Sequence, residues 1–163
     1  MTDAEKKVYE VLETLGISYT RHEHPAVFTV EQAEAHWANI QGAHCKNLFL
    51  RNQKGSRHYL VILPARKSAD LKKLARQLGE DNLSFASPER LLRFLSLEPG
   101  SVSPFGLINN SQKDVKVIID QDLKTAGRVN FHPNVNTVTL GLSAADFEKF
   151  LSWTGHKIQY IPL

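Results

Sequence analysis

The segment from Leu97 to Asn110 has the composition of a loop that holds a small ligand. Two prolines fix φ at about −65° and two glycines permit positive φ, so the backbone here can follow a defined path close to a ligand. Ser101 and Ser103 place hydroxyl groups beside backbone N–H groups, a combination that can hold an ester, a carboxyl or a phosphate. An ordinary Pro/Gly connection between two apolar strands would have the same composition, so this segment alone leaves both interpretations open.

Lys46 is a second candidate because it begins an apolar, β-prone stretch. Alternation along a strand places Lys46 on one face with Leu48 and Leu50, and places Cys45, Asn47, Phe49 and Arg51 on the other. If the first face is buried, the Lys46 ammonium needs an anionic partner, which could be a ligand. The alternative is a lysine that extends from the strand end into solvent.

His132 is the third candidate. It lies between Phe131 and Pro133 at the end of an expected strand, where a side chain can be held rigidly at the mouth of a pocket. Most of the seven histidines are expected to be ordinary surface or turn residues, and only its position distinguishes this one.

Other reaction classes find little support in the sequence. His22, His24, His36, His44 and Cys45 could be combined into a metal site, but neither Cys-x-x-Cys nor His-Glu-x-x-His occurs. We therefore expect no metal and no cofactor. The segment Gly-Ser-Val-Ser-Pro does not match the Gly-x-Ser-x-Gly motif of serine hydrolases, and no phosphate-binding P-loop or dinucleotide motif is present.

The charge balance permits a nucleic-acid partner without requiring one. Twenty Lys and Arg residues against 17 Asp and Glu give a formal net charge of +3. Two expected helices carry basic ridges that could meet phosphates or could be ordinary solvated faces. The ridges consist of Lys72, Lys73 and Arg76 on one helix and Arg90 and Arg93 on the other.

Hydrophobic periodicity and turn residues predict alternating helices and strands. Helices are expected at 3–15, from about 29 to 38, at 69–78 after Ser68 as N-cap, at 88–95 after Ser87, and at 144–154 after Ser143. Strands are expected at 17–23, 46–51, 58–63, 105–108, 115–120, 128–131, 137–142 and 156–161. This order predicts an α/β (mixed α+β) fold in which one mixed sheet, curled toward a barrel, carries helices on its outside.

Length and composition predict one domain over residues 1–163. A single cysteine, Cys45, excludes an internal disulfide and favours a reducing compartment. The N-terminus lacks the apolar core of a signal peptide, and no run approaches the roughly 20 apolar residues of a membrane span. We expect a cytoplasmic protein with no membrane partner.

Several motifs in the same order resemble the YbaK/prolyl-tRNA synthetase insertion-domain superfamily, and the likeness covers nearly the whole chain. Within it the sequence is most similar to the free-standing alanyl-tRNA(Pro) deacylases called ProXp-ala. The motifs that carry the resemblance are His24-Pro25, Phe28-Thr29, Lys46-Asn47-Leu48-Phe49-Leu50, Leu83-Ser84-Phe85-Ala86, the segment from Gly100 to Asn109, and Phe131-His132-Pro133. Asn110 and Ser103 depart from the residues common in that family, Asp and Thr, and leave the shape of the pocket open.

The resemblance implies a YbaK-like editing-domain fold and metal-free hydrolysis of an aminoacyl ester at the 3′ end of mischarged tRNA(Pro). It implies that Lys46 and Asn47 hold the terminal adenosine or its phosphate. The residues implied to line the aminoacyl pocket are Phe28, Thr29, Gly100, Ser101, Val102, Ser103 and Pro104. His132 would border this pocket. The basic ridges would then contact the acceptor stem, and prolyl-tRNA synthetase could be a partner.

The implied reaction needs no strong protein base. Backbone N–H groups from Gly100 to Ser103 would stabilise the oxyanion while water attacks, and the substrate's own 2′-hydroxyl could orient that water. A pocket too small for proline would admit alanine, with cysteine and serine as further candidates. A non-catalytic module that senses aminoacyl-tRNA or an amino acid, and a hydrolase of other small acyl esters, are the alternatives.

Overall fold

The computed structural model describes residues 1–163 and contains five α-helices, two 3-10 helices and eight strands. The α-helices are α1 (Asp3–Thr14), α2 (Val30–Trp37), α3 (Leu71–Leu78), α4 (Pro88–Leu95) and α5 (Ala144–Thr154), and the 3-10 helices are η1 (Pro104–Asn109) and η2 (Gln121–Thr125). The strands are β1 (Thr20–Glu23), β2 (Ala43–Asn52), β3 (His58–Pro64), β4 (Leu83–Phe85), β5 (Val115–Asp120), β6 (Arg128–Phe131), β7 (Val138–Ser143) and β8 (Ile158–Ile161).

The strands form one mixed sheet in the order β1-β7-β6-β2-β3-β5-β8, and β4 adds to β2. β2 is antiparallel to β3 and β4 but parallel to β6, and β3, β5 and β8 run parallel to one another. β1 and β8 end the order without pairing with each other, so the sheet is curved and open. This confirms the expected α/β class with a curved mixed sheet, although the barrel does not close.

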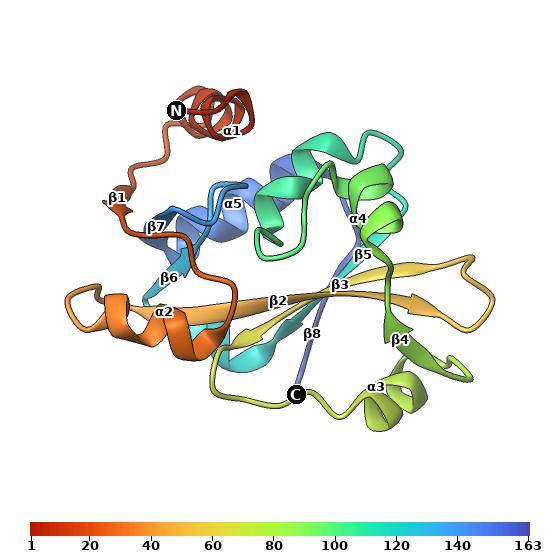
Figure 1. The fold of residues 1–163 in the computed structure, drawn as a ribbon. Helices are drawn as coiled ribbons and strands as arrows, with labels where there is room; N and C mark the ends of the chain where they lie inside the picture. The colour runs from red at the N-terminus through yellow and green to blue at the C-terminus, as the bar shows by residue number, and fades with distance from the viewer.

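Helices cover both faces of the long β2–β3 hairpin (Figure 1). Alternation along the strands divides the core, because Phe49, Leu60 and Ile62 join a cluster of 24 buried residues that includes side chains of α1, α4, α5 and η1. Leu50 and Val61 point the other way, into a cluster of nine that includes residues of α3. The two faces predicted for β2 are therefore confirmed, and α3 and α4 lie on opposite faces of the sheet.

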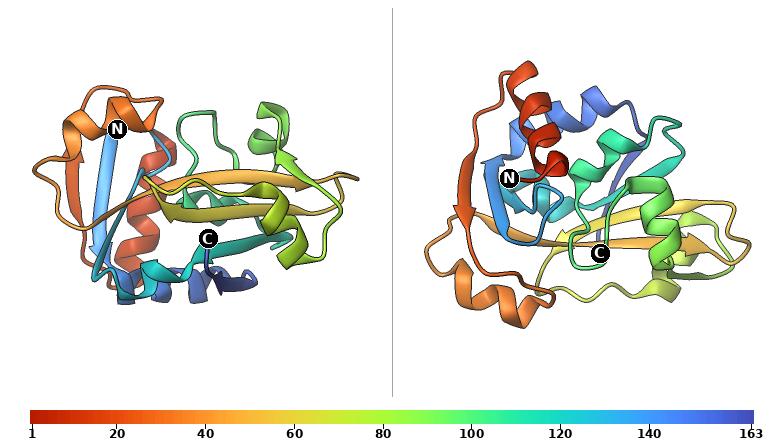
Figure 2. Two further views of the ribbon diagram at one scale, coloured as in Figure 1. Left: turned by 90° about the horizontal axis from the view of Figure 1, so that it is seen from below. Right: turned by 45° about the horizontal axis from the view of Figure 1, so that its top comes forward.

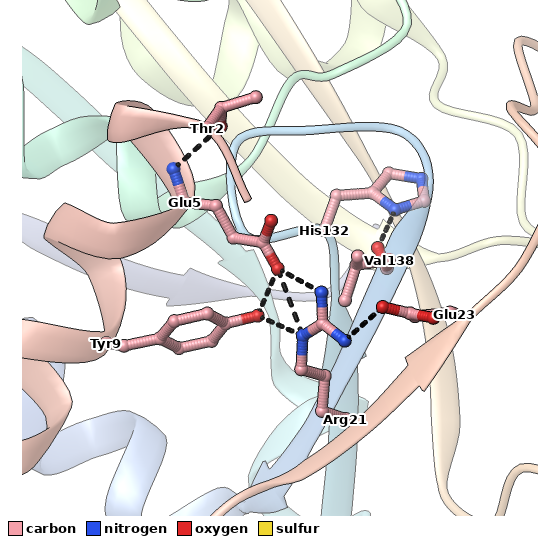
Figure 3. A network of polar contacts seen from close by, with 7 residues as sticks. All are labelled: Thr2, Glu5, Tyr9, Arg21, Glu23, His132 and Val138. Atoms are coloured by element: carbon pink, nitrogen blue, oxygen red, sulfur yellow. Dashed lines mark hydrogen bonds and ion pairs between the residues drawn. The ribbon is translucent and has the colours of Figure 1, made fainter.

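A buried ion-pair network attaches α1 to the edge strand β1 (Figure 3). Glu5 is 3% exposed, and its Oε1 accepts hydrogen bonds from Arg21 Nε at 3.1 Å and Nη2 at 2.8 Å. Tyr9 donates to the same carboxylate, while Arg21 Nη1 also pairs with Glu23 at 2.6 Å. Because a buried charge needs compensation, these contacts hold β1 and α1 together beside β7.

Local capping signals explain the helices that the sequence predicts well. Ser87 accepts a hydrogen bond from Arg90 N at 3.2 Å and begins α4 at Pro88, while Ser143 accepts from Asp146 N at 3.1 Å and begins α5. Thr29 accepts from Gln32 N at 3.1 Å, and Gln32 Oε1 accepts from Phe28 N at 2.8 Å, which completes the capping box of α2. No helix in the structure combines the length and apolar character required to cross a membrane.

Several expectations about the elements were wrong or too long, and one strand was missed. Residues 105–108, expected as a strand, belong to the 3-10 helix η1, because Ser103 Oγ accepts from Phe105 N at 3.1 Å and caps the turn that begins at Pro104. The segment 97–110 therefore follows a helix and is not flanked by strands. Asp70, and not Ser68, caps α3 by accepting from Lys73 N at 3.1 Å. Strands β1 and β8 are shorter than the ranges 17–23 and 156–161, and β4 was not predicted.

Candidate active site

A gap in strand pairing opens one edge of β2. β6 pairs with β2 only at Ala43 and His44, and β4 pairs with it only from Leu50 to Asn52. β3 occupies the other edge of β2 along this whole length. The residues of β2 between the two short pairings therefore have no neighbouring strand on one side, and this part of the sheet is free to face a ligand.

A cavity of about 200 Å³ lies at this open edge. α2 and α4 lie at opposite ends of β2, and the loop that follows α4 runs between them (Figures 1 and 2). The lining residues come from four segments that are distant in the sequence: Val27, Phe28, Thr29, Val30, Ala33 and Trp37; Cys45, Lys46 and Asn47; Gly100 and Val102; and His132. The structure thus brings all three sequence candidates to one pocket.

Gly100 shapes the mouth of this cavity. Its φ of +89° is a conformation that L side chains rarely adopt, and a Cβ at this position would lie 2.8 Å from Cδ1 of Phe28. The Phe28 ring packs there although 67% of the residue is exposed. The absence of a side chain on Gly100 therefore lets an exposed aromatic ring border the cavity.

Two backbone amides of this loop have no partner within the protein. The N–H groups of Gly100 and Val102, both lining residues, make no hydrogen bond within the protein. The N–H of Ser101 is not free, because it donates to Glu98 O at 3.1 Å. Free amides on a fixed loop are the donors that stabilise an oxyanion.

Three residues predicted for this wall lie elsewhere. Ser103 is fully buried, and its hydroxyl oxygen accepts the hydrogen bond that caps η1. Pro104 is buried beside it as the first residue of η1, and Ser101 does not line the cavity. Of the segment from Gly100 to Pro104, only Gly100 and Val102 line the cavity.

His132 has a defined tautomer. Its Nδ1 lies 2.8 Å from the carbonyl oxygen of Val138, so Nδ1 carries the hydrogen and Nε2 has a free lone pair (Figure 3). Burial, helped by the nearby His24, lowers the pKa of His132 below its ordinary value, against the opposing effect of the Val138 hydrogen bond. A neutral imidazole with an acceptor nitrogen therefore borders the cavity.

Lys46 and Asn47 contribute polar groups from β2 itself. The ammonium group of Lys46 makes no ion pair or hydrogen bond within the protein, and the side-chain amide of Asn47 makes no hydrogen bond either. Both residues line the cavity. A free cation at the start of a pocket wall can pair with an anionic ligand.

The two basic ridges lie apart. Arg90 and Arg93 are on α4, which packs on the same face of the sheet as Phe49 and leads directly into the Gly100 loop. Lys72, Lys73 and Arg76 are on α3, on the opposite face. The guanidinium group of Arg90 already makes hydrogen bonds within the protein, because its Nη1 donates to Gly55 O at 3.1 Å and to His58 Nε2 at 3.0 Å.

Sequence reasoning missed several apolar residues of the lining. Val30, Ala33 and Trp37 are three and four residues apart on α2, so the helical period alone could have placed them on one face. Cys45 was assigned to the correct face of β2 but not to a pocket. Burial raises the pKa of its thiol to about 12, so it serves as an apolar wall residue.

The fold and the cavity together define a mixed α/β domain with a small ligand pocket at the edge of β2 that is left unpaired between β6 and β4. The family model described as the aminoacyl-tRNA editing domain matches residues 24–150, and the chain belongs to this family. It is 40% identical to the prolyl-tRNA editing protein ProX of Acetoanaerobium sticklandii, over 99% of this chain and 98% of that protein.

Two further likenesses agree with this assignment. The chain is 36% identical to prolyl-tRNA synthetase associated domain-containing protein 1 of Danio rerio, over 94% of this chain and 84% of that protein. A solved structure described as a candidate trans-editing enzyme for prolyl-tRNA synthetase superposes with a TM-score of 0.73, covering 100% of this chain and 99% of the other. At 23% sequence identity this second likeness establishes the fold.

Proposed function

We propose that this protein is a trans-editing deacylase that hydrolyses the ester between tRNA(Pro) and a wrongly attached amino acid, with alanine as the principal one. The observation that carries the proposal is the cavity where Lys46, Asn47, Gly100 and His132 meet, in a chain 40% identical to a prolyl-tRNA editing protein over almost its whole length. In this proposal residues 1–163 act as one editing unit, in the cytoplasm, where charged tRNA is used.

The size of the cavity suits an aminoacyl group. At about 200 Å³ it is smaller than the roughly 300–1,000 Å³ of pockets for drug-sized ligands. Val27, Ala33, Trp37 and Val102 give it apolar walls suited to a methyl side chain. A synthetase gains only about 1–3 kcal/mol of discrimination from one methylene, so a second pocket that excludes proline and admits alanine corrects what the first cannot.

The reaction requires only positioning and electrostatic stabilisation. Water attacks the ester carbonyl carbon, and the N–H groups of Gly100 and Val102 donate to the oxyanion that forms. One such donor typically contributes about 2.7–4 kcal/mol. The bond from carbon to the ribose oxygen then breaks, that oxygen takes a proton, and the free amino acid and the tRNA hydroxyl are released. The substrate's 2′-hydroxyl and Nε2 of His132 are the acceptors that we place near the attacking water.

The position of the 3′ end follows from the charges around the cavity. Lys46 has no partner in the protein, so we assign its ammonium group to the terminal adenosine or its phosphate, with the Asn47 amide beside it. Arg93 and Arg90 lie on α4, which leads directly into the Gly100 loop, and are assigned to the acceptor stem. Lys72, Lys73 and Arg76 would be reached only by a tRNA or a bound prolyl-tRNA synthetase that extends around the sheet edge.

Turnover under substrate excess tests this proposal. Limiting protein is mixed with alanyl-tRNA(Pro), and we expect many esters to be hydrolysed per protein molecule. Tight binding without turnover would show a sensing module instead, and equal activity on an alanyl ester lacking the tRNA body would show a general small-ester hydrolase. Lys46→Met keeps the apolar stem and removes the charge, and we expect it to reduce activity at least about tenfold, whereas Lys54→Met in the exposed hairpin turn should not.

A further inference from the structure

The part of β2 that borders the cavity presents its backbone edge as well as side chains. Cys45, Lys46 and Asn47 are consecutive residues of β2, and all three line the cavity. Side chains of consecutive strand residues point to opposite faces of a sheet. A space that borders three consecutive residues therefore runs along the edge of the strand, where backbone N–H and C=O groups point.

The pairing of β2 decides which carbonyl groups point to this edge. The register of β2 with β3 is continuous, so no bulge interrupts the alternation of its backbone groups. The carbonyl oxygen of His44 accepts from Ala65 N at 2.8 Å, directly after β3, whereas that of Phe49 accepts from Ala86 N at 2.9 Å, directly after β4. Asn47 precedes Phe49 by two residues, so its carbonyl group points away from β3, toward the open edge.

The carbonyl group of Asn47 receives no hydrogen bond from a neighbouring strand or loop. β6 pairs with β2 only at Ala43 and His44, and β4 pairs with it only from Leu50 to Asn52. No backbone hydrogen bond from a turn or loop reaches Asn47. Because a backbone carbonyl group inside a protein normally has a donor, this one is available to a ligand.

The cavity offers acceptors for N–H groups but no negative charge. None of its lining residues is Asp or Glu, and Lys46 supplies a positive charge. An ammonium group in this cavity therefore has no carboxylate to pair with and must bind to neutral acceptors. A carbonyl oxygen is such an acceptor, and its hydrogen bond with a charged donor is stronger than one with a neutral donor.

We infer that the backbone carbonyl group of Asn47 accepts a hydrogen bond from the free α-amino group of the aminoacyl ester, so that the pocket selects amino acid esters over acyl esters that lack this group. This inference rests on the proposed function. The loop from Gly100 to Val102 holds the developing oxyanion, and β2 holds the amino group. Contacts from two separate segments fix the orientation of the reacting carbonyl group.

Binding of amide analogues tests this inference without any hydrolysis. Two forms of tRNA(Pro) that end in 3′-amino-3′-deoxyadenosine are prepared, one acylated with alanine and the other with propionic acid, which lacks only the amino group. We expect the alanyl amide to bind at least about tenfold more tightly, as the loss of one hydrogen bond from a charged donor predicts. Equal binding of the two amides, tighter binding of the propionyl amide, or binding of neither would overturn the inference.

A lactyl amide separates a hydrogen bond from a general effect of charge. Its hydroxyl group is a neutral donor at the position of the amino group, so its affinity should lie between those of the alanyl and propionyl amides. An affinity no higher than that of the propionyl amide would contradict hydrogen bonding to a carbonyl group. If the alanyl amide is selected but alanyl-tRNA(Pro) is not hydrolysed, the proposed function fails and the recognition of the amino group stands.

Asn47→Ala distinguishes the backbone acceptor from the side chain. Oδ1 of Asn47 is also buried and without a hydrogen-bond partner, and the substitution removes it but keeps the backbone carbonyl group. We expect overall affinity to fall, while the ratio of alanyl to propionyl affinity stays within about threefold of that of the unaltered protein. Loss of this ratio in a variant that is folded by thermal unfolding would assign the recognition to the side-chain amide and overturn the role of the backbone.

Discussion

Gly100 and Phe28 meet at the mouth of the cavity so closely that no side chain fits between them. A Cβ on Gly100 would lie 2.8 Å from Cδ1 of Phe28, and the φ of +89° already excludes most L residues. We therefore expect Gly100→Ala to displace the Phe28 ring, shift the free amides and lower deacylation at least about tenfold. The left-handed conformation should also cost about 1–2 kcal/mol of unfolding free energy.

Gly16→Ala is the matched control for strain alone. Gly16 also has a positive φ, +68°, but a Cβ there would meet no atom within 4 Å, and the residue follows α1 away from the cavity. We expect a similar loss of stability by urea unfolding and unchanged deacylation. Full activity of Gly100→Ala would show that the Phe28 contact does not shape the site.

The free Nε2 of His132 should contribute to the reaction. His132→Phe keeps a ring of similar size but removes both the acceptor and the hydrogen bond to Val138. The loss of one hydrogen bond in the transition state corresponds to about a tenfold fall in kcat, since tenfold in rate equals about 1.4 kcal/mol. His22→Phe, in β1 and outside the cavity lining, is the control, and a comparable fall in that variant would exclude a specific role for His132.

Acidification should destabilise the fold through His58. Burial and the neighbouring Arg90 lower the pKa of His58 to about 4, whereas the unfolded value is about 6.5. Between these values the unfolded chain binds a proton that the folded protein does not, so the stabilisation is complete above about pH 6.5 and declines as the pH falls toward 4. The slope for one such group is at most about 1.4 kcal/mol per pH unit.

Comparison with His58→Phe isolates this contribution. Phenylalanine can keep the ring packing of His58 against Phe94 and Phe49. Urea unfolding at pH 7.5, 6 and 5 should show a steeper loss of stability for the unaltered protein than for the variant. His44, His132 and His156 also have lowered pKa values, but their effects are common to both proteins. Parallel pH profiles would contradict the assignment to His58.

Arg93 and Arg76 form a matched pair for locating the tRNA. Each is exposed in the last turn of its helix, but Arg93 is on α4, which leads into the Gly100 loop, and Arg76 is on α3, on the opposite face of the sheet. We expect Arg93→Ala to raise KM and to reduce the slope of log affinity against log salt by about 1, as the loss of one phosphate contact does. Arg76→Ala should leave both quantities unchanged, and a larger effect of Arg76→Ala would place the acceptor stem on α3.

Elements with local signals could be predicted from the sequence. The bounds of α4, β5 and β6 agree with those expected, because Ser87-Pro88 fixes a helix start and short β-branched runs between turn residues define strands. The 3-10 helix η1 could not be predicted in this way. Its four-residue apolar run Phe-Gly-Leu-Ile has no resolvable period, and the capping contact from Ser103 decides its conformation.

Strand ends and loop chemistry were enough to name candidate residues for the site. Lys46, His132 and the loop that contains Gly100 were candidates from residue type and position, and the family resemblance joined them into one pocket. The structure places all three at one cavity. Cys45 was missed because its place beside the cavity depends on how β6 and the Gly100 loop pack against β2, which no local pattern encodes, whereas the helical spacing of Val30, Ala33 and Trp37 was a local signal that was not used. Ser103 was assigned to the wall from its hydroxyl, whereas the fold uses that hydroxyl as a helix cap.

The most direct test of the account compares hydrolysis of alanyl-tRNA(Pro) with hydrolysis of prolyl-tRNA(Pro) by the same protein preparation. If the cavity of about 200 Å³ selects by size, kcat/KM for the alanyl ester should exceed that for the prolyl ester at least about 100-fold. Cysteinyl- and seryl-tRNA(Pro) are the intermediate cases. Equal hydrolysis of the alanyl and prolyl esters, or no hydrolysis of either above the rate in buffer, would contradict the proposed editing function.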